Sequence, residues 1–320
     1  MRAVQVERTG GPEVLTVVDL PTPDPGPGQV LVDVVAAGVN YIDTYRRSGV
    51  YPLALPAVLG SEGAGHVAAL GPGVEGFAPG QAVAWKEAPG SYAEQVLVPA
   101  GELVPVPDGV ELPTAAAVLL QGLTAHYLAT DTYPVTAGTW ALVHAGAGGV
   151  GLLLTQLLKL KGAHVLATVS TPAKAELARA AGADDVVDYA QASARARELT
   201  GGRGVDVVYD SVGKDTFEDS LTALRPRGLM ALFGGSSGQV PPFDVQRLNA
   251  LGSLFLTRPT LASYTQTREE LLSRTDELFG WIAAGRLDVR VGGTYPLPDV
   301  RRAHEDLQGR RTTGKLLLLP

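Results

Sequence analysis

A glycine-rich turn between a strand-like and a helix-like run is the feature that most constrains the fold. Residues 139–158 read TWALVHAGAGGVGLLLTQLL, a β-type apolar run followed by a helical one. Between them, Gly146, Gly148 and Gly151 satisfy the pattern G-x-G-x-x-G. In this setting the three glycines allow a tight turn, close approach of a pyrophosphate, and close packing of helix on strand. The segment therefore predicts a dinucleotide-binding turn rather than an ordinary glycine turn, with the phosphates at the helix N-terminus beside Gly149 and Val150.

The same segment is apolar enough, and long enough, to resemble a membrane span. Its order of β-type run, glycine cluster and helical run indicates strand, turn and helix instead. We therefore expect no membrane association.

Strand-like and helix-like runs alternate from residue 113 to residue 257. The helix expected after Thr171 has Pro172 at its first position and Gly182 just past its end, an arrangement typical of helix caps. Residues 112–129 are helical in pattern, with Gly122 as a candidate break between two helices. This alternation predicts an α/β fold with a doubly wound parallel sheet of the Rossmann type.

The N-terminal part has a different texture. Residues 1–112 contain short runs with period-two alternation, such as VLVDVV at 30–35, separated by Pro/Gly clusters. These are signals of a small β-sandwich or barrel. The tail, residues 258–320, has a long amphipathic helix at roughly 267–284, a short helix and a final strand, but no core of its own. We expect it to return and complete the first domain, leaving 113–257 as the second.

The end of the second strand of the alternating region predicts which dinucleotide binds. An NAD site carries an Asp or Glu about 20 residues after the glycine turn, to bind the ribose 2′-hydroxyl. Here Ser170 occupies that position, no acid stands near it, and Lys174 follows one helical turn later. A missing carboxylate beside a cation favours a 2′-phosphate, so we predict NADPH, although Lys174 could also be a solvated helix residue.

Composition excludes several other classes. The chain has no cysteine, so disulfides, thiolate zinc sites, iron–sulfur clusters and cysteine nucleophiles are impossible. The net charge of −7 disfavours a nucleic-acid partner. The N-terminus lacks the apolar core of a signal peptide. These observations predict a cytoplasmic protein.

Several sequence blocks, in order along the chain, resemble the medium-chain dehydrogenase/reductase superfamily, and within it the zinc-free quinone oxidoreductase branch related to ζ-crystallin. The blocks are GGPEVL, AAGVNYIDTYRRSGVYP, LGSEGAG, GSYAEQ, LLQGLTAHYL, HAGAGGVG, VDVVYDSVG, FGGSSG, LTRP and GRRTTGKLLLLP. The resemblance implies a GroES-like β domain and a Rossmann domain with the active-site cleft between them. That arrangement agrees with the β-type pattern of the N-terminal part and the strand–helix alternation of the second domain.

Two of these blocks bear on metal binding. At these two positions, zinc alcohol dehydrogenases of the superfamily carry motifs similar to GVCxTD and GHExxG, whereas this chain has GVNYID and GSEGAG. Asn40 stands where a cysteine ligand would be, and Ser61 where a histidine would be, so too few ligands remain for the usual zinc site. We expect no metal. Glu62 and Asp43 survive from the motif as acids, and we expect Glu62 to pair with a nearby cation or with backbone amides and to shape the pocket.

The loss of zinc predicts the kind of substrate. Without a Lewis acid, substrates that accept hydride unaided are favoured, such as a quinone or an alkene conjugated to a carbonyl. Their oxygens would need only hydrogen-bond donors. Asn40, Tyr45 and Tyr51 lie in the matching segment and are the candidate catalytic residues, although Tyr and Asn in such segments also serve packing and turns.

The resemblance also implies cofactor contacts by position. Thr124 would lie near the nicotinamide, Lys174 and Tyr189 would form the 2′-phosphate pocket, and Arg310 would reach the adenosine phosphate from the C-terminal segment. The loops that line the nicotinamide side would contribute Ser211, Phe233, Gly234, Ser236 and Thr257.

Two alternatives rest on other features. GGSSG matches G-x-S-x-G, a hydrolase elbow with Ser236 central, but Pro241 and Pro242 discourage the helix that must follow it. The chain could also bind NADPH without catalysing a reaction, as relatives of ζ-crystallin can.

We predict an NADPH-dependent quinone reductase, with enone reduction as the alternative. We also expect a homodimer, in which apolar strands such as LMALF and LFLT could pair across a two-fold axis.

Overall fold

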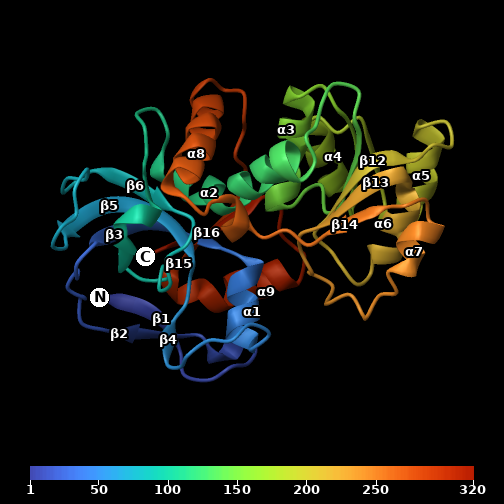
Figure 1. Cartoon of the computed structure of the whole chain (residues 1–320). Coiled ribbons are helices and arrows are strands. Elements are labelled where there is room, and N and C mark those ends of the chain that lie inside the picture. The colour runs from blue at the N-terminus through green and yellow to red at the C-terminus, as the bar shows by residue number, and fades with distance from the viewer. The chain divides into compact units, whose positions relative to one another are not determined.

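A computed structural model describes all 320 residues, which divide into two compact units (Figure 1). Unit 1 contains residues 1–120 and 267–320, and unit 2 contains residues 121–266. The domain boundaries expected at residues 112 and 258 therefore shift to 120 and 267. The boundary at residue 120 lies inside a continuous helix, residues 112–127, close to the break that the sequence suggested at Gly122.

Unit 1 is built on β-sheets. Strands β1 (Arg2–Val6), β2 (Thr16–Asp19) and β4 (Ala57–Val58) form a three-stranded antiparallel sheet in the order β2-β1-β4. A second sheet has the order β15-β16-β3-β5-β6-β8, and β7 also pairs with β3. Its strands are β3 (Gln29–Val39), β5 (Glu62–Leu70), β6 (Ala82–Trp85), β7 (Gln95–Pro99), β8 (Leu103–Pro105), β15 (Val291–Pro296) and β16 (Lys315–Leu319).

The period-two pattern of β3 explains its central place. Val30 and Val32 are fully buried in one apolar cluster, as their alternation predicts, and β3 pairs with β5, β7 and β16. Burial of valine side chains of this size stabilises the fold by roughly 1.5–3 kcal/mol each.

The C-terminal tail completes unit 1, as expected. Strand β16 pairs antiparallel with β3, placing Leu316 opposite Val39 and Leu318 opposite Ala37. The remaining helices of unit 1 are α1 (Tyr41–Ser48), α8 (Arg268–Ala283) and α9 (Val300–Gln308). Helix α8 starts with a capping box at Thr267 and is followed by Gly285 in the left-handed region, which matches the helix predicted at 267–284.

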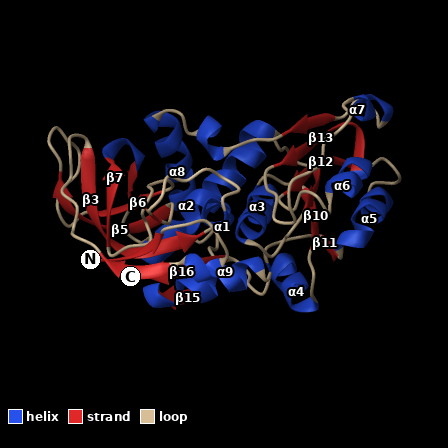
Figure 2. Ribbon diagram, turned by 90° about the horizontal axis from the view of Figure 1, so that it is seen from below, coloured by secondary structure: helices blue, strands red, loops and turns tan.

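Unit 2 is a six-stranded, all-parallel sheet in the order β11-β10-β9-β12-β13-β14. Its strands are β9 (Trp140–Val143), β10 (His164–Thr168), β11 (Asp185–Val187), β12 (Val205–Asp210), β13 (Leu224–Leu232) and β14 (Phe255–Thr257). Helices α3 (Gly149–Leu160) and α4 (Pro172–Ala180) lie on one side of the strands, and α5 (Ala192–Leu199) and α6 (Phe217–Ala223) on the other (Figure 2). A short α7 (Gln246–Ala250) precedes β14. This is the predicted doubly wound Rossmann sheet.

Local predictions in this region are mostly confirmed. Thr171 caps α4 through a hydrogen bond from the Lys174 amide, and Gly182 adopts a positive φ just beyond the helix. The break expected at Gly122 is wrong: α2 (Leu112–Tyr127) runs through that residue, which is buried, and a π-helical turn (Leu128–Thr132) follows. Tertiary packing overrides the modest helix penalty of a single glycine. No helix has both the length and the apolar character needed to cross a membrane.

Candidate functional site

The glycine turn precedes α3 as predicted, but the structural roles of its glycines differ from those expected. The turn residue with positive φ is Ala145 (φ 53°), not Gly146. A Cβ on Gly146 would lie 2.8 Å from the Cβ of Ala167 in β10, so this glycine permits packing against the neighbouring strand. A Cβ on Gly151 would overlap the carbonyl oxygen of Ala145, so Gly151 lets the helix sit against the turn.

The first turn of α3 provides an anion-binding end. Gly148 is the N-cap residue, and its carbonyl accepts the amide of Leu152 at 3.0 Å. The amides of Gly149, Val150 and Gly151 precede that hydrogen bond, so helix geometry directs them beyond the helix end. A pyrophosphate fits donors and a dipole arranged in this way. A Cβ on Gly148 would lie 3.1 Å from the carbonyl oxygen of Ala145, closer than an ordinary van der Waals contact. The tight turn therefore favours glycine at position 148.

Loops at the carboxyl ends of β12 and β13 hold several of the predicted nicotinamide-side residues together. The carbonyl of Asp210 accepts the amides of Phe233 (2.9 Å) and Gly234 (3.3 Å). The carbonyl of Ser211 accepts the amide of Ser236 at 3.2 Å. Ser211, Phe233, Gly234 and Ser236 are thus neighbours in one backbone network, in keeping with a site at the carboxyl edge of a parallel sheet. A turn, not a helix, follows Ser236, so the geometry of a nucleophile elbow is absent.

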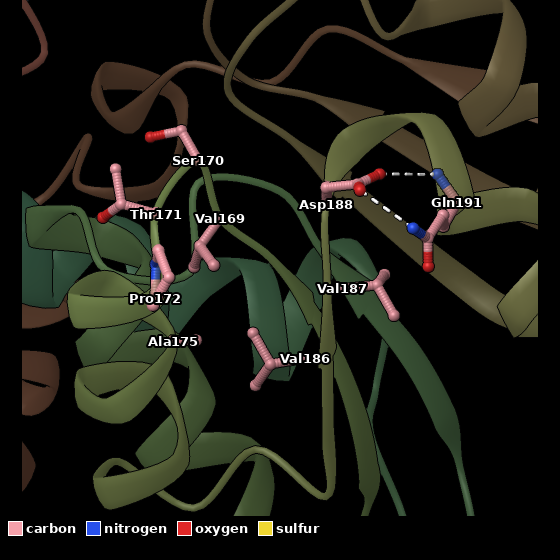
Figure 3. A pocket seen from close by; sticks show the side chains of 9 residues that line it. All are labelled: Val169, Ser170, Thr171, Pro172, Ala175, Val186, Val187, Asp188 and Gln191. Carbon is pink, nitrogen blue, oxygen red and sulfur yellow. Dashed lines mark hydrogen bonds between the residues drawn. The ribbon is translucent and has the colours of Figure 1, made fainter.

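The ends of β10 and β11 enclose a hollow of about 310 Å³ (Figure 3). Its apolar part comes mainly from valine, proline and alanine, and its polar part includes Ser170. The lining residues are Val169, Ser170, Thr171, Pro172, Ala175, Val186, Val187, Asp188 and Gln191. Sequence reasoning missed Asp188 and Gln191. The Asp188 carboxylate accepts hydrogen bonds from both the backbone and the side-chain amide of Gln191, at 3.1 and 2.9 Å.

The other predicted cofactor residues lie in different places. Lys174 is in the first turn of α4, and Tyr189 follows β11. Both are therefore close in sequence to residues that line this hollow. Thr124 is largely buried within α2, and Thr257 ends β14. Arg310 belongs to unit 1, where it follows α9 with a positive φ of 54°.

The candidate catalytic residues of unit 1 lie along α1: Asn40 precedes it, Tyr45 is within it and Tyr51 follows its end. Asn40 is 4% exposed and caps α1 in a capping box with Asp43. The Tyr45 and Tyr51 rings meet edge to face with centroids 5.5 Å apart, and Tyr51 is 38% exposed. Tyr45 and Tyr51 therefore form one aromatic cluster. Asn40 is close to them in sequence, but its side chain is buried.

Glu62 has a direct partner that the sequence did not reveal. The Glu62 carboxylate is completely buried and forms an ion pair with the ammonium of Lys315, itself 3% exposed. Oε1 also accepts the side-chain amide of Asn40 at 2.8 Å, and Oε2 accepts the backbone amide of Leu120 at 2.9 Å. Burial lowers the pKa of Lys315, while the Glu62 carboxylate acts to raise it. Both parts of the sequence expectation, a cation and a backbone amide, are confirmed.

The amide of Asn40 is held on both sides by this pair. Its Oδ1 accepts from Lys315 at 2.7 Å, and its Nδ2 donates to Glu62 and to the carbonyl of Gly38. A cation must face the oxygen, so Lys315 fixes which way the amide points. Asn40 would have to give up one of these bonds to donate to a substrate oxygen. The geometry therefore favours a positioning role for it.

A second buried acid is satisfied by hydroxyls. Asp43 accepts hydrogen bonds from Ser61 (2.7 Å) and Tyr92 (2.9 Å), and burial raises its pKa although these bonds act to lower it. The Arg47 guanidinium donates to Nδ1 of His304 at 3.0 Å, which leaves the proton on Nε2, facing the Tyr92 oxygen. Burial lowers the pKa of His304 to about 3, helped by the Arg47 charge, so the ring is neutral at neutral pH.

The two positions that bind metal in zinc relatives are thus committed to other contacts. Ser61 donates to Asp43, and Asn40 joins Glu62 to Lys315. No group of three or more His, Cys, Asp or Glu side chains is arranged to hold a metal ion.

Comparisons with known proteins agree with this architecture. Residues 26–108 match the alcohol dehydrogenase GroES-like domain, and residues 149–275 match the zinc-binding dehydrogenase family. The chain is 46% identical to a quinone oxidoreductase of Pseudomonas aeruginosa, over 100% of this chain and 99% of the relative. It is also 41% identical to a 2-haloacrylate reductase of Burkholderia sp, over 99% and 98%.

Two solved structures superpose over their full length. A mycobacterial protein complexed with NADPH is 52% identical, with a TM-score of 0.98 and 100% of each chain covered. Escherichia coli quinone oxidoreductase complexed with NADPH is 44% identical, with the same TM-score and coverage. The chain is a medium-chain dehydrogenase/reductase. Within that superfamily it belongs to the zinc-free quinone oxidoreductase branch.

Proposed function

We propose that this protein is an NADPH-dependent quinone oxidoreductase that works without zinc. The observation that carries the proposal is the pairing of a complete dinucleotide turn at residues 146–151 with Asn40 and Ser61 at the metal-ligand positions. Full-length similarity to proteins described as quinone oxidoreductases supports it.

The residues present fit NADPH. The amides at the start of α3 suit the pyrophosphate, and the turn's glycines leave room for its approach. Ser170 follows the end of β10, where an NAD site would carry an acid, and Lys174 supplies a cation one turn later. We propose that Ser170, Lys174, Tyr189 and Arg310 bind the adenosine phosphate, and that Thr124, Ser211, Phe233, Gly234, Ser236 and Thr257 line the nicotinamide.

Bound NADPH supplies a hydride from C4 of its nicotinamide. The quinone gains that hydride and one proton from solvent, and it becomes an aromatic hydroquinone. In this proposal Tyr45 and Tyr51 orient the substrate oxygens by donating hydrogen bonds. Asn40, held by Lys315 and Glu62, fixes the start of α1 and with it the tyrosine cluster.

Reduction of a double bond conjugated to a carbonyl is the second candidate. One relative is described as a 2-haloacrylate reductase, and such an alkene also accepts hydride without a metal. The tyrosine donors would serve the carbonyl oxygen equally well.

A steady-state panel decides between these functions. NADPH consumption is followed by its absorbance with simple quinones and with α,β-unsaturated carbonyls, and each is repeated with NADH. We expect the highest kcat/KM with a quinone and NADPH. Faster reduction of the unsaturated carbonyls would select the second candidate, and tight NADPH binding with no turnover on any acceptor would leave a cofactor-binding protein.

We further propose a cytoplasmic homodimer. Strand β14 is the edge of its sheet, and Phe255 on it is 60% exposed, with Val245 nearby in sequence 65% exposed. An apolar edge strand of this kind favours pairing with a second copy across a two-fold axis. Sedimentation velocity should show a dimer that Phe255→Asp weakens; a monomer for the unmodified protein would refute the assembly.

A further inference from the structure

A buried histidine lies beneath the glycine turn and both of its ring nitrogens are engaged. His144 directly follows β9 and is 1% exposed. Its Nδ1 is 2.8 Å from the hydroxyl of Thr168 at the end of β10, and its Nε2 is 2.9 Å from the hydroxyl of Ser220 in α6. The ring therefore connects the end of β10 to helix α6.

The hydrogen-bond network fixes the protonation state of the ring. The Ser220 hydroxyl donates to Oδ2 of Asp210 at 2.8 Å, so it can only accept from His144. Nε2 must then carry the proton, and Nδ1 accepts from Thr168. Burial lowers the pKa of His144, although Asp210 acts to raise it, so the neutral form fits both contacts.

The same network holds the backbone of the neighbouring loops. The carbonyl of Thr168 accepts the amide of Gly146, the first glycine of the turn, at 2.9 Å. Oδ1 of Asp210 accepts the amides of Val212 and Gly213, in the loop after β12. His144 thus connects the strand ends that carry the proposed cofactor residues.

One face of the His144 ring stacks on Tyr189. The ring centroids are 5.8 Å apart and the planes differ by 13°. Tyr189 is only partly buried and lies beyond β11, one residue after Asp188, which lines the hollow with Ser170. An offset stack of this kind restricts the orientation of the Tyr189 ring. The histidine itself cannot rotate, because both nitrogens are hydrogen-bonded.

We infer that His144 is a positioning residue for cofactor selectivity: it holds Tyr189 in place to receive the 2′-phosphate of NADPH. The inference rests on the proposed cofactor site, in which Tyr189 binds that phosphate. The stack, not the hydrogen bonds, transmits the effect, and the hydrogen bonds only fix the ring. A ring at position 144 should therefore preserve selectivity even without nitrogens.

Two substitutions separate these contributions. His144→Phe keeps an aromatic face for Tyr189 but loses both hydrogen bonds. His144→Gln keeps an amide that can reach Ser220 but loses the ring. Dissociation constants for NADPH and NADH are measured by fluorescence titration on variants whose circular dichroism shows a folded chain.

The ratio of the NADH to the NADPH dissociation constant is the readout. We expect His144→Gln to lower it by about 2- to 10-fold, the range for loss of one aromatic pair, and His144→Phe to change it by less than about 2-fold. Loss of general stability would weaken both cofactors together and leave the ratio unchanged. An unchanged ratio in His144→Gln, or equal losses in both variants, would overturn the inference.

A double-mutant cycle with Tyr189→Ala tests the route. If His144 acts through Tyr189, His144→Gln should have no further effect on the ratio in the Tyr189→Ala background. Additive losses would overturn the inference while leaving the proposed function intact. Equal affinity of the unmodified protein for NADH and NADPH would overturn the inference together with the NADPH part of the proposed function. Failure to reduce quinones would refute only the proposed quinone reductase activity and leave the inference standing.

Discussion

The buried ion pair between Lys315 and Glu62 makes a quantitative prediction. Lys315→Met replaces the ammonium with an apolar group of similar length and leaves the Glu62 carboxylate without a cation. Breaking a buried pair by removal of one partner costs about 3–5 kcal/mol of unfolding free energy. Two donors to Glu62 remain, the side chain of Asn40 and the backbone amide of Leu120, so we expect a loss near the lower end, about 3 kcal/mol.

Differential scanning calorimetry and chemical denaturation measure this loss. For domains of 150–250 residues, 1 kcal/mol shifts Tm by about 2–4 °C, so the unit 1 transition should fall by roughly 6–12 °C. Two matched controls define the cause. Glu62→Gln in the Lys315→Met background removes the stranded charge and should restore most of the stability. Arg2→Met breaks an ion pair whose side chains are 47% and 36% exposed, and should cost at most about 1 kcal/mol.

The electrostatic reasoning would be refuted by either of two results. If Lys315→Met destabilises the chain no more than Arg2→Met does, Glu62 does not depend on its cation. If the double variant is less stable than Lys315→Met alone, lost packing and not a stranded charge dominates the effect.

Three further predictions concern separate features. His304 is neutral in the folded chain, with a pKa of about 3 against about 6.5 when unfolded. The neutral ring's contribution to the unfolding free energy is fully present above pH 6.5 and falls as the pH drops toward 3, by about 2 kcal/mol at pH 5. His304→Gln should therefore reduce the difference in unfolding free energy between pH 7 and pH 5. An equally steep pH dependence in this variant would contradict the reasoning. Gly151→Ala should destabilise unit 2 by about 1–3 kcal/mol and weaken NADPH binding, because its Cβ overlaps the Ala145 carbonyl, whereas the control Gly280→Ala, inside α8 with open space around it, should stabilise by roughly 0.5–1 kcal/mol. Lys174→Ala should raise KM for NADPH but not for NADH, and an unchanged preference would remove Lys174 from the proposed pocket.

The sequence predicts the fold well because its signals are local. Strand periodicity, the capped helix at Thr171 and the glycine turn each depend on residues a few positions apart. The return of the tail to unit 1 is also predictable, since residues 258–320 contain no core of their own. The uninterrupted helix through Gly122 is not, because burial on all sides outweighs the local cost of glycine.

The electrostatic partners of the site are harder to predict, because they are distant in the chain. Lys315 reaches Glu62 only through the register of β16 on β3, which places Leu316 opposite Val39. The stacking of His144 on Tyr189 likewise depends on the order of the strands in the sheet, which brings together the ends of β9, β10 and β11. Sequence spacing carries no information about either pair.

The register of β3 and β5 also explains why the acid at position 62 requires a particular neighbour. Gly38 lies directly opposite Glu62, and a Cβ at Gly38 would overlap the Glu62 side chain. The space left by that glycine admits the carboxylate, Lys315 neutralises it, and the amide of Asn40 bridges the two. The second buried acid, Asp43, is connected to Arg47 only by hydrogen bonds, through Tyr92 and His304. The charge that acts to lower its pKa is Lys315, so this one ammonium stabilises both buried carboxylates beside Asn40.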